Sequence, residues 1–214
     1  MRKHALGSLH PSTARIYNNI GCVYVEFSEF KQARRSFEAA LDIQRSALST
    51  EEESGQLMFA TATTLCNLGY LYRFRDMHTK ACFVLKEALG MQEKVLGKSN
   101  PSVLSTMDNL ADSCANSGNT NEALKYYELV LGRIRSQGAT DKKSRRAGAV
   151  LLYKISRVYR KKSRWPEQLE RLKEARDIAK LDAELTGRSD PLERKILYDI
   201  RACRENIERN RDRI

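Results

Sequence analysis

The chain has 214 residues, of which 41% are hydrophobic and 30% are charged, and its formal net charge at pH 7 is +11. This length is enough for one folded domain, and the composition is too polar for a membrane span. The five cysteines are scattered without paired spacing, and the first residues lack the apolar segment of a signal peptide. We therefore expect a protein of a reducing compartment, in the cytoplasm or facing an organelle surface from the cytosol.

The N-terminal fifth of the chain contains two helical patterns. Residues 1–10 are interpreted as a tail. Pro11 fits the first turn of a helix, where its missing N–H group costs nothing. The first pattern ends near residue 26, and the second covers about 30–49. The polar stretch at 49–55 is interpreted as an exposed loop or a frayed helix end.

The clearest helix pair lies in residues 101–130. Met107, Leu110 and Cys114 fall on one face of the first helix. Turn residues at 118–121 break the pattern, and a second amphipathic helix follows. A helix, a tight turn and a second helix of about 34 residues form the tetratricopeptide unit, which cannot bury its apolar face alone and needs stacked copies.

Three further copies can be aligned when Leu110 and Ala111 are numbered as repeat positions 7 and 8. Those two places are taken by Ile20-Gly21, Leu68-Gly69 and Ile155-Ser156, with spacings of 48, 42 and 45 residues between successive position-8 residues. The residue at position 8 is small in every copy, which lets the two helices of a unit approach closely. The position-7 residues are expected in the core.

The longer spacing points to a family. The run EKVLGKSNPSVLSTMDNLA at residues 93–111 resembles the repeats of kinesin light chains, which have a period of about 42 residues, a Leu-Gly before His-Pro or Asn-Pro, and Asn-Asn-Leu-Ala in the first helix. His10-Pro11 and residues 18–21 follow the same pattern. The resemblance covers about residues 10–180, and it implies a solenoid that binds other proteins.

We predict an all-α, right-handed α-solenoid over residues 11–187. Its four units lie at about residues 11–50, 57–97, 101–137 and 145–185, and the basic stretch 138–146 connects the last two. A C-terminal capping helix follows at 188–214, with Leu197, Ile200 and Ile207 on its inner face and charged residues outside.

The first helices of such units line the inner groove, where Asn recurs at position 6. Asn19, Asn67 and Asn109 hold this place in the first three units, and Lys154 holds it in the fourth. An amide offers both donors and an acceptor, so a ladder of them can hold the backbone of an extended peptide. The resemblance implies this role, because related families use Asn there for peptide backbone. The alternative is that these Asn residues are merely tolerated at exposed places. The full clamp that binds chaperone tails is not found.

Charge is concentrated at the C-terminal end. Residues 141–214 hold 22 Lys and Arg against 13 Asp and Glu, a net charge of +9, which leaves +2 for the rest. We expect a protein or peptide partner whose acidic residues meet the fourth unit and whose apolar or aromatic residue lies near Tyr70 and Phe74. A solvated basic surface is the alternative explanation. The predicted groove comprises Asn19, Asn67, Tyr70, Arg73, Phe74, Asn109, Lys154, Arg157, Arg160 and Lys161.

Catalytic motifs are lacking in the sequence. It has no glycine-rich phosphate loop and no His-Glu-x-x-His pattern, so we predict neither an enzyme nor a small-molecule substrate, cofactor or metal. His78 and Cys82 have the spacing of two ligands, which do not make a metal site. Cys22 and Cys66 could line the groove as reactive thiols.

Two other functions compete with peptide binding. The basic C-terminal half, with the run 157–164, could bind RNA, although Tyr159 is the only aromatic residue in that run and is expected to be buried. An acidic membrane surface is the third possibility, for which the capping helix lacks a clear apolar outer face.

Overall fold

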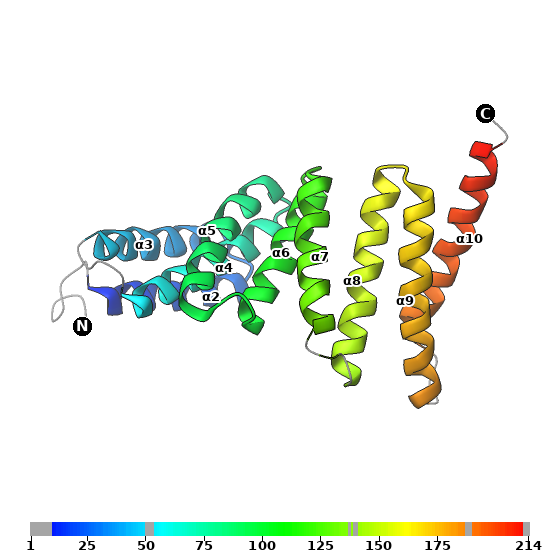
Figure 1. The fold of residues 1–214 in the computed structure, drawn as a ribbon. Helices are drawn as coiled ribbons and strands as arrows, with labels where there is room; N and C mark the ends of the chain where they lie inside the picture. Colours follow the sequence, from blue (N-terminus) through cyan, green and yellow to red (C-terminus); the bar gives the residue numbers. More distant parts are fainter. Residues whose placement is uncertain (1–9, 50–53, 137, 139–140, 187–189, 212–214) are drawn as a thin grey trace. The chain divides into compact units, whose positions relative to one another are not determined.

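The computed structural model describes residues 10–49, 54–136, 138, 141–186 and 190–211. Within these residues the regular structure is α-helical throughout (Figure 1). The helices are α2 (Pro11–Glu26), α3 (Phe30–Leu48), α4 (Gly55–Phe74), α5 (His78–Leu96), α6 (Pro101–Asn116), α7 (Thr120–Ser136), α8 (Lys142–Lys161), α9 (Trp165–Thr186) and α10 (Pro191–Arg211). The predicted tail at 1–9 and most of the polar stretch at 49–55 lie outside the described residues.

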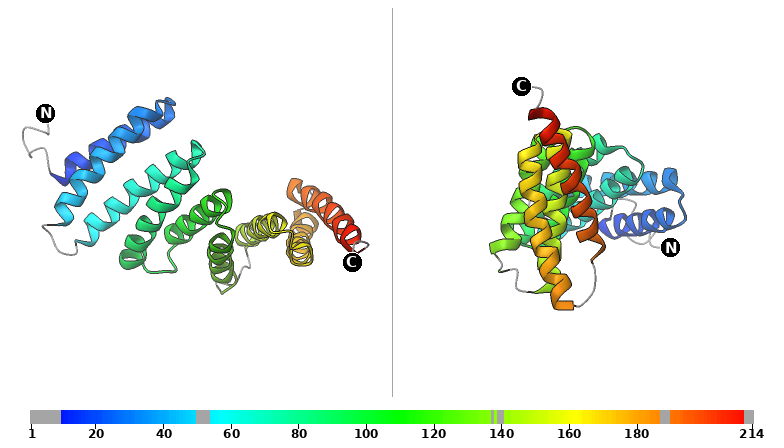
Figure 2. Two further views of the ribbon diagram at one scale, coloured as in Figure 1. Left: turned by 90° about the horizontal axis from the view of Figure 1, so that it is seen from above. Right: turned by 90° about the vertical axis from the view of Figure 1, so that its right-hand side faces the viewer.

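The chain divides into two compact bodies, Met1–Gly118 and Asn119–Ile214. The N-terminal body contains α2 to α6, and the C-terminal body contains α7 to α10. Helices that follow each other in the chain pack side by side within each body: α3 on both α2 and α4, α5 on both α4 and α6, α8 on α7 and α9, and α10 on α9 (Figure 2). This is the packing of stacked helix pairs.

Side-chain caps begin several helices where the sequence predicts them. His10 Nδ1 accepts a hydrogen bond from the backbone N–H of Ser12 at 3.1 Å, and Pro11 occupies the first turn of α2. Asn100 Oδ1 accepts from the N–H of Ser102 at 2.9 Å at the start of α6. Each cap satisfies a backbone donor that the helix leaves unpaired, so the connections between pairs are fixed locally.

Close helix approach explains the small residues at position 8. A Cβ atom on Gly21 would lie 2.5 Å from Phe37 Cε1, and one on Gly69 would lie 2.7 Å from Leu85 Cγ. Phe37 and Leu85 are 1% and 2% exposed. The predicted pairing of a small residue in the first helix with a large one in the second is therefore confirmed in both complete pairs of the N-terminal body.

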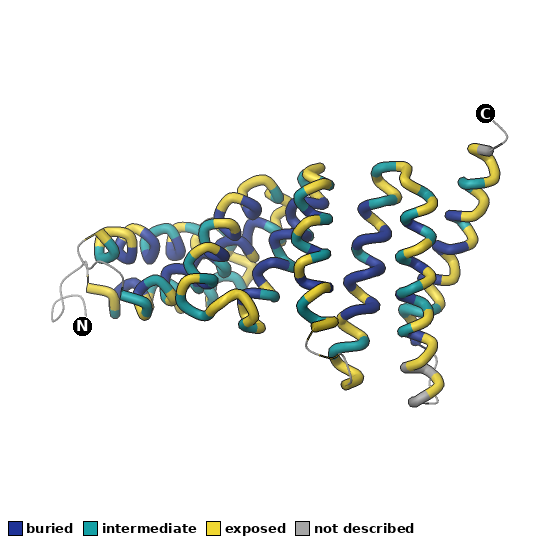
Figure 3. The backbone as a smooth tube through the Cα atoms, viewed as in Figure 1, coloured by how far each residue is buried: buried dark blue, intermediate teal, exposed yellow. Residues whose placement is uncertain are grey.

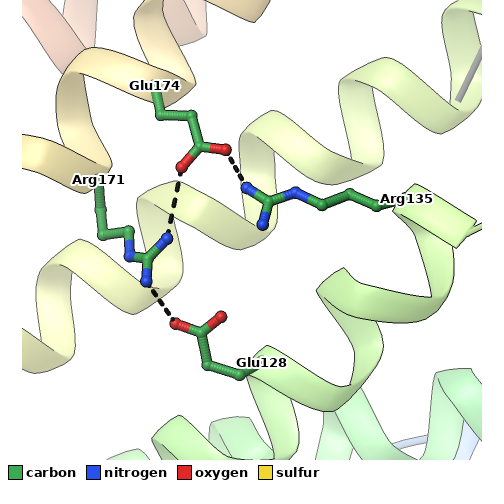
Figure 4. A network of polar contacts seen from close by, with 4 residues as sticks. All are labelled: Glu128, Arg135, Arg171 and Glu174. Carbon is green, nitrogen blue, oxygen red and sulfur yellow. Dashed lines mark hydrogen bonds and ion pairs between the residues drawn. The ribbon is translucent and has the colours of Figure 1, made fainter.

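Ion pairs join the second helices of successive units. In the N-terminal body, Arg45 of α3 donates to both carboxylate oxygens of Glu87 on α5 at 2.9 Å. In the C-terminal body, Arg135 of α7 pairs with Glu174 of α9 at the same two repeat positions, 32 and 26 (Figure 4). Arg171 also bridges the two helices, 3.0 Å from Glu128 and 3.4 Å from Glu174.

The predicted core differs from the structure in α2 and α10, the first and last described helices. Ile20, expected in the core at position 7, is 39% exposed, whereas Leu68, Leu110 and Ile155 at the same position are at most 3% exposed. Positions 3, 7 and 10 of a first helix face the second helix of the preceding unit, and among the described residues no helix packs on that side of α2. The core prediction fails at Ile20 because no second helix precedes α2 in the described residues.

The capping helix shows the reverse situation. Its buried apolar residues are Ile196, Ile200 and Cys203, at positions 3, 7 and 10, while Leu197 is 38% exposed and Ile207 is half-buried. Positions 4, 8 and 11 face the second helix of the same unit, which α10 lacks in the described chain. The inner face predicted through Leu197 was therefore wrong at that residue.

The basic connection predicted at 138–146 is mostly helix. Asp141 caps α8, accepting from the Ser144 N–H at 2.9 Å and from the Ser144 hydroxyl at 2.6 Å. The two hydrogen bonds, led by the hydroxyl, lower the pKa of this carboxyl group. Helix α8 begins at Lys142, so the basic residues there extend the first helix of the fourth unit by almost a turn.

Candidate functional site

The first helices of the N-terminal body carry a connected row of amides. Asn67 of α4 donates from Nδ2 to Asn18 Oδ1 on α2 at 2.9 Å and lies 3.5 Å from Cys22 Sγ. Asn18 in turn donates to Asn19 Oδ1 at 3.5 Å, at the upper limit for a hydrogen bond. Asn19 is exposed and Asn67 is half-buried. Asn67, at position 6, thus links two neighbouring first helices.

Asn109 takes part in a second link between first helices. Arg73 of α4 donates from Nη1 to Asn109 Oδ1 and from Nη2 to Asp112 Oδ2, the latter at 3.0 Å. The Arg73 and Asp112 side chains are 25% and 20% exposed, so water screens this ion pair only partly. The charge of Arg73 is therefore largely balanced within the N-terminal body.

An aromatic hollow of about 440 Å³ lies beside this ion pair. Tyr70 and Phe74 on its wall are 57% and 60% exposed, although the Phe74 ring also packs on Phe30 with centroids 5.1 Å apart. The full lining is Tyr70, Arg73, Phe74, Asp76, His78 and Asn116. Three of the predicted groove residues therefore share one hollow, together with two polar residues of the α4–α5 turn region that sequence reasoning did not include.

A second hollow of about 520 Å³ lies between α2 and α4, with Asn19 on its wall. Arg15, Phe59 and Thr63 also line it, and Phe59 is 42% exposed. Sequence reasoning did not select Phe59 because it precedes the first position of the repeat alignment. Its only signal was a large aromatic residue in the first turns of the helix, directly after Leu57 and Met58.

The C-terminal body presents the basic part of the predicted groove on α8. Arg157, Arg160 and Lys161 are exposed, and Lys154 Nζ lies 5.8 Å from the centre of the Tyr127 ring. Figure 3 shows α8 as largely buried along its middle, with exposed residues towards its start.

One carboxylate lies within this basic face. Asp199 of α10 is 8% exposed, accepts a hydrogen bond from the Tyr153 hydroxyl at 2.8 Å, and lies 3.7 Å from Arg160. Burial, and then the hydrogen bond to Asp199, raise the pKa of Tyr153 to about 12. Sequence reasoning missed Asp199, which occupies position 6 of α10 just as Asn67 and Asn109 do in α4 and α6.

The thiols near the groove are not activated. Burial, with a smaller effect of Glu26, raises the pKa of Cys22, and burial raises the pKa of Cys66 against two weaker hydrogen bonds. A thiol with a raised pKa has less of the reactive thiolate at neutral pH. His78 lies 3.5 Å from Asp76, while Cys82 Sγ lies 3.5 Å from Cys114 Sγ. Across the described residues, no three His, Cys, Asp or Glu side chains gather in a metal-binding cluster.

Helix pairs that stack through small residues define an α-helical repeat protein of the solenoid class. Profiles described as tetratricopeptide repeat match residues 13–52 and 60–136, which together make up more than half of the chain. The chain belongs to the tetratricopeptide-repeat family, and its predicted family and all-α solenoid fold are confirmed.

Solved structures support the same fold. The kinesin light chain TPR-like repeats of Podosopora anserina superpose with a TM-score of 0.69 at 17% identity, covering 95% of this chain and 90% of that one. BtubC (BKLC) from P. vanneervenii superposes with a TM-score of 0.66 at 18% identity, covering 85% of this chain and 68% of that one. The predicted likeness to kinesin light chain repeats is therefore confirmed at the level of fold.

Curated relatives come from much longer proteins. The clustered mitochondria protein homolog of Candida albicans is 26% identical over 125 residues, which cover 58% of this chain and 9% of that protein. The homolog from Neosartorya fischeri is 26% identical over 138 residues, which cover 64% and 10%. The chain thus spans about a tenth of these relatives. None of its described helices is long and apolar enough to cross a membrane.

Proposed function

We propose that this chain is a non-catalytic scaffold or adaptor module that binds an extended peptide segment of a partner protein on the faces of its first helices. The observation that carries the proposal is the aromatic hollow, where Tyr70 and Phe74 are exposed beside half-buried amide and carboxylate groups. Exposed aromatic side chains next to fixed polar groups are typical of peptide-recognition sites. We place this module in the cytoplasm, and the length of the relatives fits a module that works as part of a larger protein.

The amide row supplies the contacts to peptide backbone in this proposal. The links within the N-terminal body use the Nδ2 donor of Asn67 and the Oδ1 acceptor of Asn109. We assign the opposite atoms, Asn67 Oδ1 and Asn109 Nδ2, to a backbone N–H and a backbone carbonyl of the bound segment. The internal contacts also hold both amides in place, which lowers the entropy lost when the peptide binds.

The basic face of the C-terminal body supports an acidic partner in this proposal. Arg157 and Arg160 are exposed, and Asp199, which lies 3.7 Å from Arg160, also accepts a hydrogen bond from Tyr153. Guanidinium groups bind carboxylates through paired hydrogen bonds, so acidic side chains of the partner would bind here. Arg73 contributes less to this preference, because Asp112 balances it.

The test measures binding of fluorescein-labelled peptides to the full chain by fluorescence anisotropy. The probes are acidic peptides with and without one Trp, and a single-stranded RNA is compared at two salt concentrations. We expect saturable binding of the acidic Trp peptide that weakens at least tenfold in Tyr70→Ala and in Arg157→Glu. The matched controls are Phe83→Ala on α5 and Lys173→Glu on α9, which alter side chains that are also exposed but lie on second helices.

Two outcomes would contradict the proposal. Equal losses in the control and groove variants would show binding through general charge or hydrophobicity. Tight RNA binding with a steep salt dependence and no peptide preference would assign the basic half to nucleic acid instead.

A further inference from the structure

The first helix of the stack carries an apolar stripe on its exposed side. Ile16, Ile20, Val23 and Phe27 follow each other at spacings of four, three and four residues, which places them along one side of α2. They are 37%, 39%, 49% and 73% exposed. We call these four residues the α2 stripe.

The same repeat positions are buried wherever a preceding second helix exists. Positions 3, 7 and 10 are Thr64, Leu68 and Leu71 in α4, Thr106, Leu110 and Ser113 in α6, and Leu151, Ile155 and Val158 in α8, and each is at most 4% exposed. The helices that pack there are α3, α5 and α7 respectively. Ile16, Ile20 and Val23 occupy these positions in α2, so the chain itself shows which kind of element covers such a face.

The last described helix, α10, also has a face that no described helix covers, and that face is mostly charged. The side of α10 that lacks a partner helix carries Leu197, Arg201 and Arg204 at positions 4, 8 and 11. Two of the three are charged. The α2 stripe has no charged member. Contiguous apolar surface of this kind marks an interaction site.

The geometry points to a partner helix that packs on the α2 stripe, running antiparallel to α2, in the way α7 packs on α8. The antiparallel direction follows from two contacts in the N-terminal body. Gln44, late in α3, donates to Thr64 Oγ1 early in α4 at 3.1 Å, and Cys82, early in α5, lies 3.5 Å from Cys114 late in α6. The late end of the bound helix would therefore lie near Ile16, and its early end near Phe27.

Among α3, α5 and α7, the helix that best matches the α2 stripe is α7, because of its residue at position 31. The residue at position 31 of the second helix is Gln44 in α3 and Gln92 in α5, and in both cases the next first helix has a threonine at position 3, Thr64 or Thr106. In α7 position 31 is Ile134, and α8 has Leu151 at position 3. Gln44 donates to Thr64 Oγ1, whereas Gln92 donates to Cys66 Sγ of its own unit. Because α2 carries Ile16 at position 3, a glutamine at position 31 would meet no hydroxyl group there, and an apolar residue fits better.

The test uses a labelled peptide with the α7 sequence, residues 120–136, titrated with the full chain and followed by anisotropy. We expect saturable binding that weakens at least tenfold in Ile20→Glu and stays within twofold in the control Phe83→Glu, which charges an exposed apolar residue on α5. A peptide carrying Ile134→Gln should bind at least threefold more weakly. Circular dichroism should show the same helicity in all variants, because both altered residues are exposed.

Three results would overturn the inference. Equal binding to wild type and Ile20→Glu would mean that the peptide seats elsewhere, for example by displacing α7 from α8. The absence of saturable binding would mean that the stripe takes no helix of this type. Dimers of the chain alone that Ile20→Glu dissociates, measured by sedimentation, would assign the stripe to a second copy.

Discussion

The Tyr153 hydroxyl donates a 2.8 Å hydrogen bond to Asp199 Oδ2 and so joins α8 to α10 within the C-terminal body. Both side chains are 8% exposed. Tyr153→Phe leaves a nearly buried carboxylate without this donor, and we expect the free energy of unfolding to fall by about 1–3 kcal/mol. Urea denaturation followed by circular dichroism measures the change. An unchanged midpoint would show that Arg160 alone satisfies Asp199.

The same pair makes stability depend on alkaline pH. The pKa of Tyr153 is raised from its model-compound value of 10.0 to about 12 in the folded chain. The unfolded chain therefore loses this proton first, so the contribution is complete below pH 10 and is lost as the pH rises from 10 to 12. Tyr153→Phe should flatten this part of the stability profile. Unfolding free energies measured at pH 9, 10.5 and 11.5 test it, and parallel profiles would contradict it.

Two glycines in neighbouring helices should respond in opposite ways to alanine. A Cβ on Gly69 would lie 2.7 Å from Leu85, whereas one on Gly90 would meet nothing within 4 Å. We expect Gly69→Ala to destabilise the chain by about 1–3 kcal/mol through overpacking. Gly90→Ala should stabilise it by about 0.5–1 kcal/mol through helix propensity. Thermal and urea unfolding of both variants give the comparison, and a stabilising Gly69→Ala would contradict the close approach.

The Arg171 bridge between α7 and α9 should contribute more to the free energy of unfolding than an ion pair on the exposed surface. The Arg171 side chain is 23% exposed and contacts both Glu128 and Glu174, so Arg171→Ala leaves two carboxylates near each other. We expect a loss of about 1–2 kcal/mol, larger at low salt. The control is Lys180→Ala, because Lys180 and Glu184 are more than 60% exposed, and it should change stability by less than about 0.5 kcal/mol. Equal effects in the two variants would argue against the bridge.

The cysteines of the groove should react slowly. Burial raises the pKa of both Cys22 and Cys66, so little thiolate is present at pH 7. We expect iodoacetamide to alkylate both more slowly than it alkylates free cysteine, with rates that rise as the pH increases above 9. Peptide mass spectrometry after timed quenching measures each site, and fast labelling of either at pH 7 would restore it as a candidate reactive group.

Most of the fold could be predicted because the residues that pair the two helices lie within one repeat unit. Gly21 and Gly69 recur with Phe37 and Leu85 at a fixed offset, and this small-to-large pairing is a property of one unit. Exposure at the ends could not be predicted in the same way. Ile20 matches the core pattern as well as Leu68 does, and only the arrangement of neighbouring helices distinguishes them.

The groove remains a prediction, and the contacts among its residues could not be read from the sequence. Tyr70 and Phe74 are exposed where the pattern places them. The contacts of Asn67 with Asn18, and of Asn109 with Arg73, depend on how far one first helix is rotated against the next. That rotation cannot be predicted from a single sequence. Asp199 was missed for the same reason, since its partner Tyr153 lies 46 residues earlier.

Because the outer side of α10 is charged and that of α2 is apolar, the two ends of the repeat array differ in how easily a further unit can be added. An added unit placed ahead of α2 would meet isoleucine and valine, so it could be joined without altering the existing helices. A unit added behind α10 would bury Arg201 and Arg204, and both would first need replacement by a small and a large apolar residue. By design, the array is therefore easier to lengthen ahead of α2 than behind α10.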